Sequence, residues 1–95
     1  MTTHWDSYAA CRGMDAELWF PNSYTSPTGR YQADQAISIC LACPVRRECL
    51  DEALAAEGGL VADRRNGILA GYTPTDRYNI HRQLVRRRAR EQASA

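Results

Sequence analysis

The chain reads CLACPVRRECL from Cys40 to Leu50, and this one stretch holds three of its four cysteines. The fourth cysteine, Cys11, is separated from Cys40 by 28 residues. The two-residue gap between Cys40 and Cys43 lets two thiolates converge on one centre. If Cys49 lies on a helix, its side chain leans back toward Cys43, because helical Cβ atoms tilt toward the helix N-terminus. The spacing therefore predicts one site with three local ligands, closed from a distance by Cys11.

The N-terminal segment, Met1 to Gly13, lacks the charged region and apolar run of a secretion signal. No run of about eighteen apolar residues occurs anywhere in the chain, so no membrane span is expected. We therefore predict a cytoplasmic protein that does not enter the membrane. In that compartment, four cysteines are better explained as metal ligands or redox groups than as two structural disulfides.

The residues alone leave the identity of the centre open. Structural zinc sites usually use two close cysteine pairs, whereas this chain has one, and an iron-sulfur cluster spreads its thiolates more widely than a single ion does. Zinc nevertheless remains an alternative. A further alternative treats Cys40 and Cys43 as a thioredoxin-like redox pair, although no strand pattern precedes them as that motif requires.

Helical spacing of apolar residues predicts about four short helices and no β-strand, which indicates a small all-α bundle. The first helix is expected around Trp5–Arg12, followed by a loop from Pro21 to Gly29 that is rich in Ser, Thr and Pro. The second is expected from Tyr31 to Leu41. Its apolar stripe places Cys40 on the buried face.

The remaining helices are predicted from their end signals. Pro44 suits the first position of a third helix, which Gly58 and Gly59 should end. The glycine-bounded segment 67–71 predicts a tight turn. Thr73 followed by Pro74 then predicts a last helix that reaches about Arg90.

The formal net charge of +1 conceals two oppositely charged parts. Residues 1–63 hold four Arg against nine acidic residues, net −5, while residues 64–95 hold eight Arg against two, net +6. We expect residues 1–72 to form the metal-binding domain and residues 73–95 a basic helix and tail. Arginines of this tail, with few acidic partners, favour binding to DNA phosphates over a merely solvated helix. The predicted DNA-binding residues are Arg82, Arg86, Arg87, Arg88 and Arg90.

These motifs resemble those of the WhiB-like proteins of actinobacteria and their phages. The likeness covers roughly Trp5 to Arg90. It rests on Ala10-Cys11-Arg12-Gly13 with Asp15, on Trp19-Phe20-Pro21 where the family commonly has Phe-Phe-Pro, on the stretch from Cys40 to Leu50, and on a glycine-bounded turn before a basic tail.

The resemblance implies a redox-sensing four-iron four-sulfur (4Fe-4S) cluster that is sensitive to oxygen and nitric oxide. Its ligands would be Cys11, Cys40, Cys43 and Cys49. It also implies a non-enzymatic transcriptional regulator that docks on the C-terminal domain of the housekeeping sigma factor of RNA polymerase. The alternatives from other classes are a disulfide-reducing thiol protein in the apo form and a zinc-binding structural module.

Family members place aromatic residues near the cluster at the sigma contact, which by motif position implies Trp5, Trp19 and Phe20. The same three rings could instead form core, because the chain has few large apolar residues. The family turn usually reads Gly-Val/Ile-Trp-Gly-Gly, whereas this chain has Leu69 for Trp and Ala70 for Gly. We expect a weaker or altered sigma contact at Leu69, as in a divergent, phage-borne member. His4 and His81 are isolated and are predicted to lie on the surface.

Overall fold

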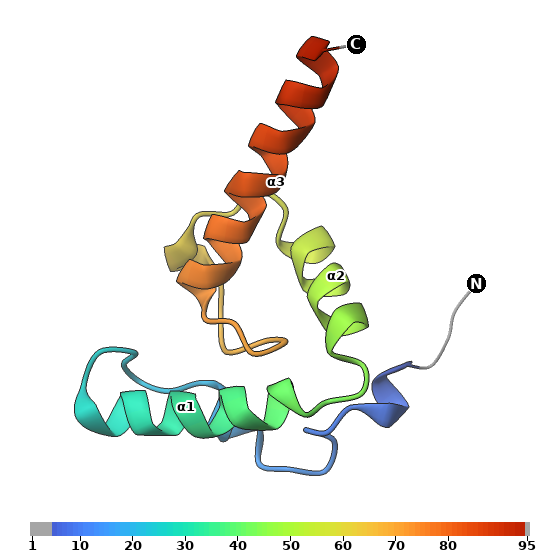
Figure 1. The fold of residues 1–95 in the computed structure, drawn as a ribbon. Coiled ribbons are helices and arrows are strands. Elements are labelled where there is room, and N and C mark those ends of the chain that lie inside the picture. The colour runs from blue at the N-terminus through green and yellow to red at the C-terminus, as the bar shows by residue number, and fades with distance from the viewer. Residues whose placement is uncertain (1–4, 95) are drawn as a thin grey trace.

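A computed structural model describes residues 5–94 of the chain (Figure 1). This part forms three α-helices and three short 3-10 helices, and its only bridge is the isolated pair Leu69 and Tyr72. The all-α prediction is confirmed, and the expected first helix is a four-residue 3-10 helix. His4 lies outside the described residues. In chain order the elements are η1 (Trp5–Tyr8), η2 (Ala16–Trp19), α1 (Pro27–Leu41), α2 (Arg46–Glu57), η3 (Ala62–Arg64) and α3 (Pro74–Ser94).

Helix α1 begins earlier than predicted, because the expected loop from Pro21 to Gly29 in fact ends at Ser26. The Ser26 hydroxyl accepts a hydrogen bond from the Gly29 N–H at 3.1 Å, and Pro27 occupies the first helical turn. A serine cap followed by proline is a helix-start signal that the polar composition of this segment concealed. The predicted buried face is confirmed, with Cys40 at its C-terminal end.

The predicted start of the third helix at Pro44 was wrong by two residues. The chain instead makes a turn in which the Arg46 N–H donates to the Cys43 carbonyl at 3.4 Å. Val45 keeps a non-helical backbone and is buried, so the helix begins at Arg46. The C-terminal prediction is confirmed, since α2 ends at Glu57 and is capped by Gly58, whose φ is 53°.

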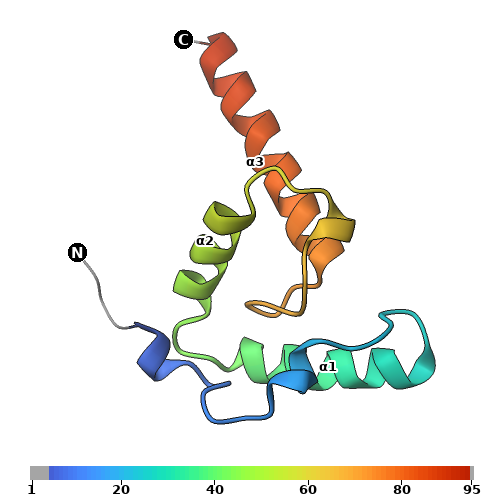
Figure 2. The same cartoon turned by 180° about the vertical axis from the view of Figure 1, so that it is seen from behind.

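Helix α3 begins at Pro74 as predicted and continues to Ser94, four residues past Arg90. Its start is fixed by two reciprocal bonds, from the Asp76 N–H to the Thr73 hydroxyl at 3.2 Å and from the Thr73 N–H to the Asp76 carboxylate at 3.3 Å. The C-terminal half of the helix extends away from the rest of the molecule (Figures 1 and 2). No helix within residues 5–94 has both the length and the apolar character to cross a membrane.

The core is small and lies where α1, η2 and the turn at residues 67–71 meet. It consists of Trp19, Ala33, Ala36, Cys40 and Ile68. Both ribbon views place this turn between the three α-helices (Figures 1 and 2). The turn is tight as predicted, with positive φ at Gly67, Ala70 and Gly71.

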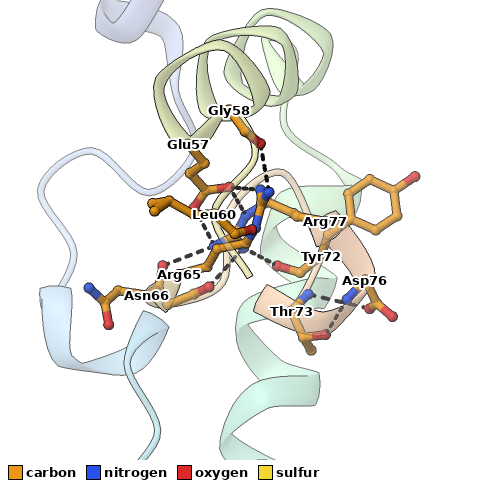
Figure 3. A network of polar contacts seen from close by, with 10 residues as sticks. Glu57, Gly58, Leu60, Arg65, Asn66, Tyr72, Thr73, Asp76 and Arg77 are labelled. Atoms are coloured by element: carbon orange, nitrogen blue, oxygen red, sulfur yellow. Dashed lines mark hydrogen bonds and ion pairs between the residues drawn. The ribbon is translucent and has the colours of Figure 1, made fainter. Parts of the chain in front are cut away.

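A buried ionic network fixes the turn to α2 and α3 (Figure 3). The Arg77 side chain is fully buried and donates to both Glu57 carboxylate oxygens at 2.9 Å. It also donates to the carbonyls of Gly67 and Tyr72 at 2.8 Å and of Asn66 at 3.1 Å. Arg65, 4% exposed, donates to the same Glu57 at 2.8 Å. These two arginines therefore support the fold, although their charges were counted with the basic C-terminal part of the chain.

Candidate metal centre

All four cysteines line one cavity of about 270 Å³. Cys40 lies in the last turn of α1, Cys43 lies in the link between α1 and α2, and Cys49 lies in the first turns of α2. Cys11 enters from the turn after η1, where its carbonyl accepts from the Met14 N–H at 3.0 Å. Their burial is graded, from buried Cys40 through half-buried Cys43 and Cys49 to exposed Cys11. The structure thus brings together cysteines from four segments of the chain.

Two of these sulfur atoms, those of Cys40 and Cys43, accept hydrogen bonds of defined length. The indole N–H of Trp19 donates to Cys40 Sγ at 3.4 Å, and the backbone N–H of Ala10 donates to Cys43 Sγ at 3.3 Å. Hydrogen bonding to the backbone also lowers the pKa of Cys49, through Ala70, and the pKa of Cys11, through its own backbone. Donors aimed at sulfur stabilise thiolates, which are the form that binds metals.

Burial raises the pKa of Cys11 and of Cys49, partly opposed by backbone hydrogen bonds. The neighbouring cysteines raise both pKa values further, because thiolates held close together repel one another. A positively charged metal centre would remove this repulsion and hold the sulfurs deprotonated. The donor set therefore fits a thiolate-bound metal centre.

The size of the cavity bears on the kind of centre. A cavity needs a volume of about 10–15 Å³ to hold one water molecule. The cavity lined by the cysteines is therefore far larger than one small ion requires. Within residues 5–94, no three His, Cys, Asp or Glu side chains form a group compact enough for a single ion. The four thiols are arranged more widely than a one-ion site.

Comparison with known proteins shows the family to which this chain belongs. A family model described as "Transcription factor WhiB" matches residues 5–80. The chain belongs to the WhiB family. It is 36% identical over 72 residues to the transcriptional regulator WhiD of Streptomyces coelicolor, an alignment that covers 68% of this chain and 64% of WhiD. The chain therefore spans less than two thirds of the length of that relative.

Two further relatives are covered over more of their length. Identity to the transcriptional regulator WhiB2 of Mycobacterium tuberculosis is 33% over 84 residues, covering 88% of this chain and 81% of WhiB2. Identity to the transcriptional regulator WhiB of Streptomyces coelicolor is 35% over 81 residues, covering 85% of this chain and 79% of WhiB. The resemblance inferred from the motifs is thereby confirmed at the level of the family.

The aromatic residues predicted at a sigma contact of this WhiB-family protein occupy different environments. Trp5 is half-buried and lines the cavity, while Phe20 is 53% exposed. Trp19 is only 7% exposed and belongs to the core. Leu69 is half-buried and pairs with Tyr72 through two backbone hydrogen bonds. The contact itself stays a prediction, and Trp19 offers it little surface.

The predicted DNA-binding arginines all lie exposed on α3, Arg82 near its middle and the other four on its projecting C-terminal half. Arg82 lies over the Tyr78 ring at 5.7 Å, and Arg87 pairs with Glu91 at 3.8 Å on the surface. Their exposure leaves their role in DNA binding a prediction. His81, expected at the surface, is half-buried.

Sequence reasoning assigned no role to Arg46, a charged residue of the WhiB-family cavity. It lines the cavity, donates from Nε to the Ala70 carbonyl at 2.7 Å and lies 5.1 Å from the centre of the Tyr72 ring. Arg46 therefore ties the turn to the start of α2 beside the cysteines. Its position between Cys43 and Cys49 was the available signal, although Arg47 in the same stretch is exposed and does not line the cavity.

Proposed function

We propose that this WhiB-family protein holds a 4Fe-4S cluster on Cys11, Cys40, Cys43 and Cys49 and regulates transcription through the C-terminal domain of the housekeeping sigma factor. The Arg-rich half of α3 adds contacts to DNA. One observation carries the proposal, namely that cysteines from four separate segments line a single cavity. Hydrogen-bond donors aimed at the sulfurs of Cys40 and Cys43 support it.

The wide arrangement of the thiols favours a cluster over zinc, because four thiolates on one zinc ion must crowd around it. When bound, the cluster supplies a redox-active centre whose potential depends on its surroundings. The residues of this chain bind it and shield it. Cys40 is the most buried of the four cysteines, and Trp5 and Ala10 line the cavity together with Cys11.

A disulfide reductase needs an accessible attacking thiolate. In the Cys40–Cys43 pair, Cys40 is 8% exposed and in contact with the core, so it is poorly placed to meet an external disulfide. This burial argues against a thiol-redox function. Zinc binding and thiol-redox activity are the two alternatives that the experiment separates from a cluster.

The test is anaerobic purification of the full chain with iron, sulfide and zinc analysis. We expect about four iron and four sulfide per chain, broad visible absorption and no stoichiometric zinc. Serine at any one of the four cysteines should reduce cluster content, because a hydroxyl is a poor substitute for the soft thiolate. Leu41→Ser is the matched control, since Leu41 lies between two of the ligands but is 58% exposed. Full cluster content in two or more Cys→Ser variants would contradict the ligand assignment.

A further inference from the structure

Trp19 lies against the buried wall of the cavity, at the end of η2. Its ring is 7% exposed, and its indole N–H meets Cys40 Sγ at 3.4 Å. An indole can only donate, so the sulfur is the acceptor of this bond. The contact joins two positions that are 21 residues apart in the sequence.

The surroundings hold the Trp19 ring in place. Asp15 caps η2 by accepting from the Glu17 N–H at 3.0 Å, and the Gln32 amide of α1 donates to the Glu17 carbonyl at 2.8 Å. The Trp19 carbonyl accepts from the Ile68 N–H at 2.7 Å. Trp19 is thus fixed to α1 on one side and to the turn on the other.

Trp19 differs from the other donor to sulfur in kind. The bond to Cys43 comes from the backbone N–H of Ala10, which the backbone provides whatever the side chain. Within residues 5–94, Trp19 is the residue whose side chain donates a hydrogen bond to a thiol of the cavity. The identity of residue 19 therefore decides whether Cys40 receives this bond.

We infer that Trp19 is a positioning residue that raises the reduction potential of the cluster by holding its indole N–H on Cys40 Sγ. The inference rests on the proposed function, because Cys40 must be a cluster ligand. Hydrogen bonds to the sulfurs are among the features that set cluster potentials. A hydrogen bond from an N–H group to a ligand sulfur stabilises the reduced cluster, because the reduced cluster is more negative. The bond acts more strongly in a buried, low-dielectric site than at the surface.

Trp19→Phe tests this inference, because it keeps a ring in the core and removes the N–H. Phenylalanine is also the residue that the family motif commonly has here. We expect unchanged iron and sulfide content and a lower reduction potential in an anaerobic redox titration. At fixed potential the reduced-to-oxidised ratio should fall by up to about tenfold, which corresponds to about 59 mV for one electron.

Ile37→Val is the matched control, because Ile37 packs on the same core and its side chain has no hydrogen-bond donor. It should lower the melting temperature and leave the potential unchanged. Equal potentials in the wild type and Trp19→Phe, with the cluster intact in both, would overturn the inference alone. Absence of a cluster from the wild type would overturn the proposed function and the inference with it.

A second measurement uses the unaltered protein, in case Trp19→Phe does not fold. In ¹⁵N-tryptophan-labelled, cluster-loaded protein, spin density should reach the Trp19 indole nitrogen through the N–H···S bond and displace its resonance. The Trp5 indole has no such bond to sulfur in the described structure, so it is the internal reference. A Trp19 resonance with no more contact shift than that of Trp5 would overturn the inference.

Discussion

Glu57 is the residue on which two buried arginines depend. The side chains of Arg65 and Arg77 are fully buried, and both donate to this one carboxylate. Burial raises the pKa of Glu57, but the hydrogen bonds and charges of Arg77 and then Arg65 outweigh it, so that the pKa lies below its ordinary value. Removing one partner from such a group leaves an uncompensated buried charge, which costs far more than losing a surface pair.

Arg77→Met should lower the free energy of unfolding by about 3–5 kcal/mol, because Glu57 and three carbonyls lose a donor. Chemical denaturation followed by circular dichroism measures this. Arg47→Met is the control, since the exposed Arg47–Asp51 pair at 3.5 Å should contribute about 0–1 kcal/mol. A similar loss in the two variants would show that the buried network does not hold the fold.

The same network should give stability a defined pH dependence. Because the folded pKa of Glu57 is lowered from 4.5, its stabilisation is fully present above that value and is lost as the pH falls through the folded pKa. The stability difference between the wild type and Glu57→Gln should therefore shrink as the pH is lowered below 4.5. A difference that stays constant down to the folded pKa would contradict this assignment.

At the level of elements, the sequence predicted those ends that one local signal decides. The reciprocal caps of Thr73 and Asp76 and the glycine at the end of α2 are of this kind. The start of α2 was wrong because tertiary burial of Val45 overrides the preference of Pro44 for a helix start. The sequence likewise identified the four cysteines that line the cavity, but not the donors to their sulfurs. The Ala10 donor is a backbone N–H group, which carries no residue signature, and Trp19 was predicted at the sigma contact rather than as a donor to Cys40.

The turn at residues 67–71 is the element in which this chain departs from the family pattern. Ala70 holds a φ of 56°, a left-handed conformation that costs a residue with a Cβ about 1–2 kcal/mol. The adjoining Phe20 ring packs against Gly67 at the other end of the turn. Phe20 packs against the turn and Leu69 lies in it, so both offer apolar surface there. Ala70 of the same turn lines the cavity.

We predict that Phe20→Ala weakens binding to the C-terminal domain of the housekeeping sigma factor by tenfold or more, in order of magnitude, as expected for an aromatic interface anchor. Leu69→Ala should weaken it less, and Leu69→Trp, made with Ala70→Gly to relax the turn, should tighten it. Titration calorimetry with cluster-loaded protein measures each affinity. Tyr31→Ala is the control, because Tyr31 is 66% exposed near the start of α1. Unchanged affinity in both alanine variants would remove the turn from the interface.

The whole molecule separates its charges in space as well as in sequence. It measures 46 × 35 × 20 Å, and the C-terminal half of α3 projects from the body (Figure 1). The sequence predicted the charge asymmetry between the two parts of the chain. It did not predict which arginines would be buried, and Arg65 and Arg77 point inward to Glu57. The basic surface of the C-terminal part is therefore concentrated on the projecting helix, where Arg82–Arg90 lie exposed.

This concentration leads to a prediction about DNA. Replacing Arg82, Arg86, Arg87 and Arg88 by Ala should weaken DNA association and reduce the slope of log K against log salt by up to about 3.6, if each contact contributes about 0.9. Alanine preserves helicity, so α3 should persist. Arg30→Ala with Arg47→Ala is the control, because both arginines are exposed on the body beside an acidic partner. Fluorescence anisotropy at several salt concentrations measures the slopes. An unchanged slope in the α3 variant, with its cluster intact, would mean that the projecting helix is solvated surface and that DNA contact, if any, lies elsewhere.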